Sequence, residues 1–170
     1  MSSIVDPVML REALIEADQS GYRLELANGL GIWEVQPSKR HVSKAKKIEQ
    51  SIKPLPDSES GCGCISYQDL YIQFADGSLR RPDIAIFCRE PEEEDQAVTL
   101  VPEAVVEVVS RGSEIKDLEL NPPFFLSHGV KDVVVADPYT GLVFHHRADG
   151  IRQLKSPVEI KLECGCSLTA

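Results

Sequence analysis

Helical spacing of apolar residues predicts three helical regions in the chain. After Asp6-Pro7, which is typical of a helix N-cap followed by a first-turn proline, residues 8–18 carry apolar side chains on one face. A basic segment at 39–52 predicts a second helix. Residues 113–128 predict a third helical region. Pro122-Pro123 should divide it into a turn and a new short helix starting at Pro122, because two backbone donors are missing there.

Alternating or continuous apolar runs, bounded by turn residues, predict strands in the rest of the chain. Asn28-Gly29 and Asp76-Gly77 are turn signals that predict two hairpins, the second of them long. Two further turns predict a β-meander at the C-terminal end. The predicted strands are residues 22–26, 30–35, 64–74, 79–87, 104–110, 133–136, 142–147, 151–155 and 158–163.

The order of these elements predicts an α/β (α+β) fold with a mixed central β-sheet flanked by helices. The chain has 170 residues, 42% of them hydrophobic and 26% charged, which suffices for one compact domain over residues 1–170. No apolar stretch approaches the length of a membrane span, so we expect no membrane partner. Residues 1–7 lack the basic and apolar regions of a signal peptide, which predicts a cytoplasmic protein.

Two of the predicted buried strands each carry one carboxylate, which such strands normally exclude. Asp83 lies in the run that ends at Phe87, and Glu107 lies in the run 104–110. An isolated carboxylate in a buried strand is costly unless it is neutralised, paired or bound to a metal. Side-chain alternation allows Asp83 and Glu107 to meet if their strands are neighbours.

A pair of acids with room for water is the oxygen-rich environment that suits Mg²⁺ or Mn²⁺. The alternative is that each acid lies at a strand end and pairs with Arg80, Arg81 or Arg111, because structural ion pairs produce the same pattern. The spacing alone leaves both interpretations open.

The order and spacing of several short motifs resemble a known family. The motifs are Gly21 to Leu26, Pro37 to His41, Pro82-Asp83, Glu107-Val108-Val109-Ser110 and Gly129 to Pro138. They resemble those of the Uma-two family of restriction-endonuclease-like proteins, which belongs to the PD-(D/E)XK nuclease superfamily. The resemblance covers most of the chain and implies a restriction-endonuclease-like fold.

The resemblance implies a divalent-metal-dependent DNA endonuclease that works as a homodimer. Asp83 and Glu107 would hold Mg²⁺ or Mn²⁺, with the carbonyl of Val108 as a further ligand. An acid at the position of Glu25 approaches the metal site in this family, whereas a lone strand glutamate more often faces solvent. A histidine at the position of His41 is expected to support the site.

The lysine of the superfamily motif is missing from its usual places. Two residues after the glutamate the chain has Val109, and at the alternative position in the following helix it has Asn121. Lys116 is the remaining candidate for this charge. We therefore expect weak cleavage by a site made of Glu25, Asp83, Glu107 and Lys116, or else a catalytically degenerate module that binds nucleic acid or a protein partner as a homodimer.

Charge changes the expected DNA contact. A formal net charge of -9 disfavours long-range attraction to nucleic acid. Basic residues nevertheless cluster at 39–53, and acidic residues cluster at 90–95. The basic cluster is either a local DNA-binding surface or simply a solvated helix face.

The cysteines have an unusual distribution. The tripeptide Cys-Gly-Cys occurs at 62–64 and again at 164–166, while Cys88 stands alone. Structural zinc sites more often separate paired ligands by two to four residues. In a cytoplasmic chain we expect reduced cysteines without a ligand, with a zinc site or a redox pair as the alternatives.

Overall fold

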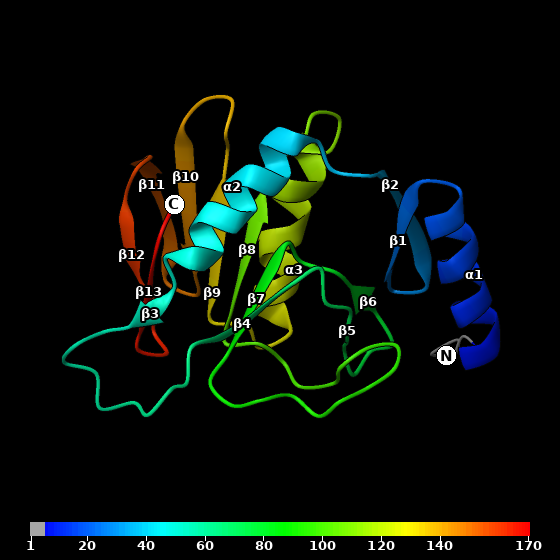
Figure 1. The fold of residues 1–170 in the computed structure, drawn as a ribbon, viewed down its shortest axis with the longest axis horizontal. Coiled ribbons are helices and arrows are strands. Elements are labelled where there is room, and N and C mark those ends of the chain that lie inside the picture. Colours follow the sequence, from blue (N-terminus) through cyan, green and yellow to red (C-terminus); the bar gives the residue numbers. More distant parts are fainter. Residues whose placement is uncertain (1–5) are drawn as a thin grey trace.

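The computed structural model describes residues 6–170, and in this range it contains three β-sheets with helices packed against the largest (Figure 1). This arrangement confirms the predicted mixed fold of sheets flanked by helices. Within the described range, no helix is both long and apolar enough to cross a membrane. The helices are α1 (Pro7–Gln19), α2 (Lys39–Gln50), the π-helix η1 (Lys116–Leu120) and α3 (Asn121–Ser127).

The central sheet contains six strands, in the spatial order β11-β10-β9-β8-β7-β4. Strands β8 and β9 run parallel, and the other neighbours are antiparallel. Strands β7 and β8 pair directly with each other, which confirms the prediction that the Asp83 and Glu107 segments lie side by side. The six strands are β4 (Ile65–Gln68), β7 (Ile84–Phe87), β8 (Ala104–Val108), β9 (Asp132–Ala136), β10 (Leu142–Arg147) and β11 (Gly150–Lys155).

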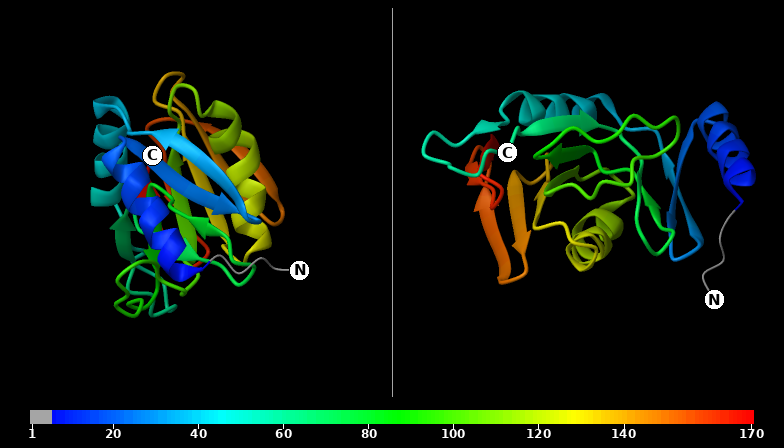
Figure 2. Two further views of the ribbon diagram at one scale, coloured as in Figure 1. Left: turned by 90° about the vertical axis from the view of Figure 1, so that its right-hand side faces the viewer. Right: turned by 90° about the horizontal axis from the view of Figure 1, so that it is seen from below.

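Helices α2 and α3 cover opposite faces of this sheet, as the right-hand view of Figure 2 shows. Side-chain alternation explains the layers. Ile84 and Ile86 of β7 pack in the same core as α2, whereas Ala85 and Phe87 pack in the core that contains Phe125 of α3. Both faces of the central strands are therefore apolar, which is why these strands read as continuous hydrophobic runs.

The predicted long hairpin is broken into two parts that belong to different sheets. Its outer half pairs β5 (Ile72–Gln73) with β6 (Leu79–Arg80), and its inner half pairs β4 with β7. The break occurs where Asp69 adopts a left-handed backbone with φ 54° and where Pro82 lacks a ladder donor. The prediction of one continuous hairpin was wrong because each arm is interrupted at this point and continues in a different sheet.

The N-terminal elements form a second sheet beside α1, at the end of the molecule opposite the C-terminal strands (Figure 1). Its order is β2-β1-β6-β5, with β1 (Tyr22–Ala27) and β2 (Leu30–Val35) joined by the predicted tight turn. Asn28 and Gly29 both have positive φ, as such a turn requires. Asp6 caps α1 by accepting a hydrogen bond from the Val8 amide at 2.8 Å, as predicted.

The last predicted strand belongs to a third sheet rather than continuing the β10–β11 hairpin. That sheet has the order β12-β13-β3, from β12 (Glu159–Lys161), β13 (Cys166–Thr169) and β3 (Lys53–Pro54). It joins the chain's end to the segment after α2, a long-range pairing that short-range turn signals do not reveal.

The proline pair does not interrupt the third helical region with a turn, so that prediction was wrong. The chain passes directly from η1 into α3, and the amide of Asn121 bonds to the carbonyl of Lys116, five residues back. Pro122 and Pro123 then occupy the first turn of α3, where their missing donors cost little. The π-turn is what permits a helix before the prolines.

Two disulfides correct the expectation of reduced, unpaired cysteines. They join Cys62 to Cys88 and Cys64 to Cys166, while Cys164 is a free, buried thiol. The second bridge spans 102 residues of sequence. Sequence spacing could not reveal these pairs, because the partners are far apart in the sequence and lie close together only in the folded chain.

Candidate active site

A polar pocket lies where β7, β8 and the helical segments meet. Asp83 immediately precedes β7, Glu107 lies in β8, and Lys116 is the first residue of η1. His41, in the first turn of α2, lies on the same pocket. All four side chains line it, so tertiary structure brings together three of the four predicted site residues with the expected supporting histidine.

Asp83 is buried and held from two sides. Its Oδ2 accepts a hydrogen bond from the Val108 amide at 2.7 Å and lies 2.9 Å from His41 Nε2. Its Oδ1 lies 3.7 Å from Arg23 Nη1, which leaves this oxygen less engaged. Burial opposes the charged form of His41, but the hydrogen bond and charge of Asp83 outweigh burial and raise the pKa of His41.

Glu107 meets Asp83 at the end of the central sheet. Its Oε2 lies 3.4 Å from the amide nitrogen of Asp83, and its Oε1 accepts a hydrogen bond from Asn121 Nδ2 at 2.9 Å. Burial, reinforced by the negative charge of Asp83, raises the pKa of Glu107 well above its usual range. A cation close to both side chains would offset the repulsion that Glu107 experiences from Asp83.

The oxygen donors of this pocket fit a hard divalent cation. Two carboxylates contribute incompletely engaged oxygens, and Val108, whose carbonyl was predicted as a further ligand, lines the same pocket. Within residues 6–170, neither acid belongs to a group of three acids, histidines or cysteines whose ligand atoms all lie within 4.8 Å of one another. Mg²⁺ and Mn²⁺ match such a site, because Mg²⁺ commonly uses one or two carboxylates and keeps several waters.

Lys116 is positioned by two acids from the N-terminal hairpin. Its Nζ lies 2.9 Å from Glu25 Oε1 and 2.5 Å from Glu34 Oε2. Burial works against its charge, but Glu25, Glu107 and Glu34 outweigh burial and raise the pKa of Lys116. A fixed, fully charged ammonium group thus stands at the pocket that holds Asp83 and Glu107.

Glu25 is buried rather than solvent-facing, and it does not line the pocket. Its second oxygen, Oε2, accepts from Arg80 Nε at 2.6 Å. Burial raises the pKa of a carboxyl, but here Lys116 and Arg80 outweigh it and lower the pKa of Glu25. Glu25 therefore holds Lys116 in place through an ion pair and does not itself line the pocket of Asp83 and Glu107.

The three arginines predicted as possible partners of the two acids are engaged elsewhere. Arg80 pairs with Glu25 and donates to Asn121, Arg81 pairs with Asp69, and Arg111 lies over the ring of Tyr139. The arginine that pairs with Asp83 is Arg23 instead, with Nη1 3.7 Å from Oδ1.

Sequence reasoning missed Asp117 and undervalued Asn121. Asp117 lines the pocket, accepts from the Ser110 amide at 3.2 Å, and burial raises its pKa to about 7. Asn121 is wholly buried between Arg80 and Glu107. Its amide accepts a hydrogen bond from Arg80 and donates one to Glu107, so it links the two side chains. The adjacency of Asp117 to Lys116 was the available signal, but a charged pair on a helix usually lies in solvent.

Comparisons with known proteins agree with the predicted family and fold. A model of the Uma-two (Uma2) family, described as "Putative restriction endonuclease", matches residues 10–163. A crystal structure titled as "a putative nuclease belonging to DUF820", from Anabaena variabilis ATCC 29413, is similar with a TM-score of 0.59. The two chains share 20% sequence identity over 81% of this chain and 80% of the other. No curated protein matches this sequence.

Proposed function

The chain belongs to the Uma-two family of restriction-endonuclease-like proteins, and from that premise we propose that it is a divalent-metal-dependent DNA endonuclease. The observation that carries the proposal is the shared pocket of Asp83, Glu107 and Lys116. It combines two carboxylates suited to a hard cation with one fixed positive charge, which are the groups that phosphodiester hydrolysis needs.

The residues divide the chemical work among them. Asp83 and Glu107 would hold Mg²⁺ or Mn²⁺, which when bound polarises the phosphate and lowers the pKa of the attacking water. The ammonium of Lys116 would bind a non-bridging phosphate oxygen and offset the charge that develops there. Glu25 and Glu34 keep Lys116 in place, and Asn121 keeps Glu107 in place.

A basic surface beside the pocket supports DNA as the substrate. His41, in the first turn of α2, lines the pocket, and a neighbouring groove is lined by Lys39, Arg40, Lys44 and Lys47 of the same helix. The Arg40 guanidinium lies 5.1 Å from the centre of the Tyr139 ring, and Arg111 lies 4.9 Å from it. Basic residues of this groove would supply charge for phosphate binding near the acids, despite the negative net charge of the whole chain.

Calorimetric titration with Mn²⁺ tests the proposal at its first step. Wild-type protein is expected to bind the ion, and Asp83→Asn and Glu107→Gln are expected to weaken binding at least about tenfold and to abolish Mn²⁺-dependent cleavage of plasmid DNA. Asp149→Asn is the matched control, because it makes the same chemical change on a turn far out in solvent. Cleavage that survives Asp83→Asn would refute the assignment.

A second candidate function is a catalytically degenerate module that binds nucleic acid. It is favoured by the engagement of Lys116 with two carboxylates, which compete with a phosphate for its charge. A protein that binds both Mn²⁺ and DNA but leaves plasmid intact at every metal concentration would support this function.

A further inference from the structure

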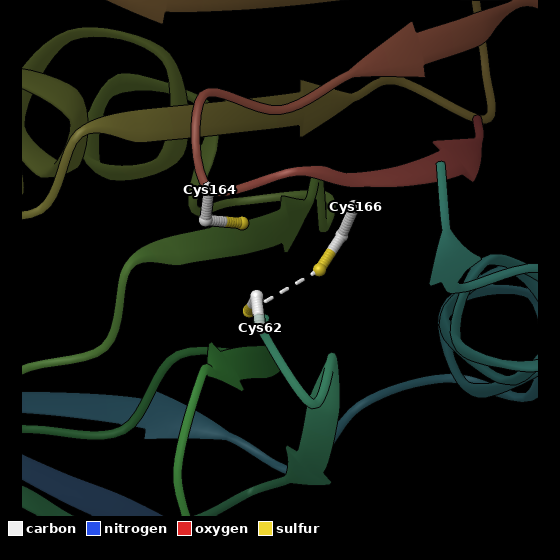
Figure 3. Close-up of side chains that lie close together, drawn as sticks. All are labelled: Cys62, Cys164 and Cys166. Atoms are coloured by element: carbon white, nitrogen blue, oxygen red, sulfur yellow. Dashed lines mark hydrogen bonds between the residues drawn. The ribbon is translucent and has the colours of Figure 1, made fainter. Parts of the chain in front are cut away.

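Five sulfur atoms converge at the other end of β7 from the active site. They come from three segments far apart in sequence: the loop before β4, the residue after β7, and the turn that enters β13. The Sγ atoms of Cys62 and Cys166, which belong to different disulfides, lie 3.5 Å apart. The sulfurs of Cys62, Cys164 and Cys166 all lie within 4.8 Å of one another (Figure 3). The sulfurs therefore form one cluster and not two separate bridges.

The backbone around the cluster is shaped to bring the sulfurs together. Gly165 has φ +94°, and a Cβ there would lie 2.2 Å from Ser58 Oγ and from Ser60 Oγ. The Gly63 amide donates to the Cys88 carbonyl at 2.9 Å, and a Cβ on Gly63 would lie 3.1 Å from that oxygen. Both central glycines of the Cys-Gly-Cys tripeptides thus permit close approach of a neighbouring segment.

Cys64 adopts a backbone that cysteine rarely takes. Its φ of 49° lies in the left-handed region, where a residue with a Cβ is held only by its surroundings. This conformation lies in the first Cys-Gly-Cys segment. It is an observation independent of the sulfur distances, and it also indicates that the loop is fixed around the cluster.

The surroundings favour a cationic occupant when the sulfurs are reduced. Cys164 is buried in an apolar core with Ile160 and Leu162. A thiolate without a partner is costly in such a core, and a soft dication offsets that cost because thiolates are its preferred ligands.

We propose that the reduced chain binds one zinc-class dication through the thiolates of Cys62, Cys164 and Cys166, with a fourth thiolate from Cys64 or Cys88. Four thiolates in a closed, apolar setting are typical of a structural zinc site. Reduction precedes binding: each disulfide takes two electrons and two protons from a dithiol, which becomes a disulfide itself. The cation then displaces the thiol protons.

The site is distinct from the active site in place and in chemistry. Asp83 precedes β7 and Cys88 follows it, so the two sites are separated by about 16 Å of strand. One offers hard oxygen ligands and the other offers soft sulfur ligands. Metal and disulfides would connect the same segments, so the loop before β4 stays joined to β13 under both reducing and oxidising conditions.

Cobalt titration of the reduced protein tests the proposal. The chain is reduced with dithiothreitol under anaerobic conditions, freed of reductant, and titrated with Co²⁺. We expect a sulfur-to-cobalt charge-transfer band that saturates at one ion per chain and disappears when Zn²⁺ is added. Zn²⁺ should also raise the thermal unfolding midpoint of the reduced chain.

Cys164→Ser separates a metal site from a pair of disulfides, since Cys164 takes part in neither bridge. This variant should keep both disulfides when oxidised and should bind Co²⁺ at least about tenfold more weakly when reduced. Asp83→Asn is the control and should keep the full band. X-ray absorption of the zinc-loaded wild type, which needs no variant, should show a sulfur-only shell.

Three results would overturn the proposal. They are a reduced, folded chain without the band, a Cys164→Ser variant with wild-type affinity, and disulfides that dithiothreitol does not reduce in the folded protein.

Discussion

Arg80 shows how one buried side chain orders the candidate active site. It lies wholly inside the protein, where a guanidinium is tolerated only when its donors are satisfied. It donates to Glu25 and to Asn121, and its charge lies 4.4 Å from the centre of the Phe124 ring. Glu25 in turn fixes Lys116, and Asn121 fixes Glu107, so Arg80 sets the position of both.

Lys116→Met is predicted to remove the charge that stabilises the transition state while leaving the metal site in place. Cleavage of plasmid DNA should fall about a hundredfold to a thousandfold, with Mn²⁺ affinity changed much less. Lys155→Met removes the same charge from an exposed position on β11 and should cleave like the wild type. Equal cleavage by Lys116→Met and wild type would exclude Lys116 from the reaction.

At the scale of elements, helix α2 serves two purposes at once. Ala45 and Ile48 face the central sheet and belong to its core, while the lysines and arginine of the other face line the groove beside the pocket. An amphipathic pattern of this kind is common on surface helices, so only its position beside the acids gives it meaning.

The double substitution Lys39→Ala and Arg40→Ala is predicted to weaken DNA binding and to make its salt dependence shallower. If both side chains contact phosphates, the slope of log affinity against log salt should fall by about two. Fluorescence anisotropy of a labelled duplex at several salt concentrations measures it. Lys131→Ala with Arg152→Ala is the control, because it removes the same charges from other parts of the surface. An equal loss of DNA affinity in that control would mean that net charge, and not the groove, determines binding.

Asp132, the first residue of β9, connects this strand to β10 and to the segment between β12 and β13. It is fully buried, its Oδ1 lies 2.6 Å from His145 Nε2 and 2.5 Å from Arg147 Nε, and its Oδ2 accepts from the Glu163 amide at 2.8 Å. Burial opposes its charge, but the hydrogen bonds from His145 and Arg147 outweigh burial and lower the pKa of Asp132.

Asp132→Asn is predicted to lower the free energy of unfolding at neutral pH by about 3 kcal/mol, since it breaks a buried charge pair. Because the folded protein lowers the pKa of this acid, its stabilisation is present above the unfolded pKa and disappears as the pH falls from about 4 toward the lowered value. Urea denaturation at several pH values should show the difference between variant and wild type shrinking in acid. A difference independent of pH would mean that lost packing, rather than lost charge, is responsible.

For the whole molecule, the N-terminal sheet ends in an edge strand with an apolar exposed face. Strand β2 lies at the edge of its sheet, and Trp33 and Val35, which share one face of it, are 58% and 63% exposed. Exposed edges of this kind are available for pairing with another chain. Nucleases that cut both strands of a duplex use paired active sites, and a two-fold dimer would supply them.

The protein is predicted to form a homodimer through β2, which Trp33 can report because it is the only tryptophan in the chain. Its fluorescence should shift to the red on dilution as the dimer dissociates, and sedimentation should show the same transition. Trp33→Glu should raise the dissociation constant at least about tenfold. Ile151→Glu changes an equally exposed apolar residue on β11 and should leave the dimer intact. A wild-type monomer at micromolar concentration would contradict the prediction.

Local sequence was sufficient for much of this protein because its signals act over short distances. Apolar spacing and the Asp6 and Asn28-Gly29 motifs predicted the first helix and hairpin. Carboxylates in otherwise apolar runs identified Asp83 and Glu107, because burial makes such residues expensive wherever they occur. The order of the short motifs was enough to indicate the family.

Tertiary structure alone decided the features that depend on distant segments. The break in the second hairpin follows from a bend shared by two arms, and the approach of Lys116 to the pocket depends on Glu25 and Glu34 from another sheet. The five cysteines lie together only in the folded chain, since Cys62 and Cys166 are 104 residues apart in the sequence. Hydrophobic pattern fixes which face of an element is buried, but the partner on that face is chosen by how all the elements pack together.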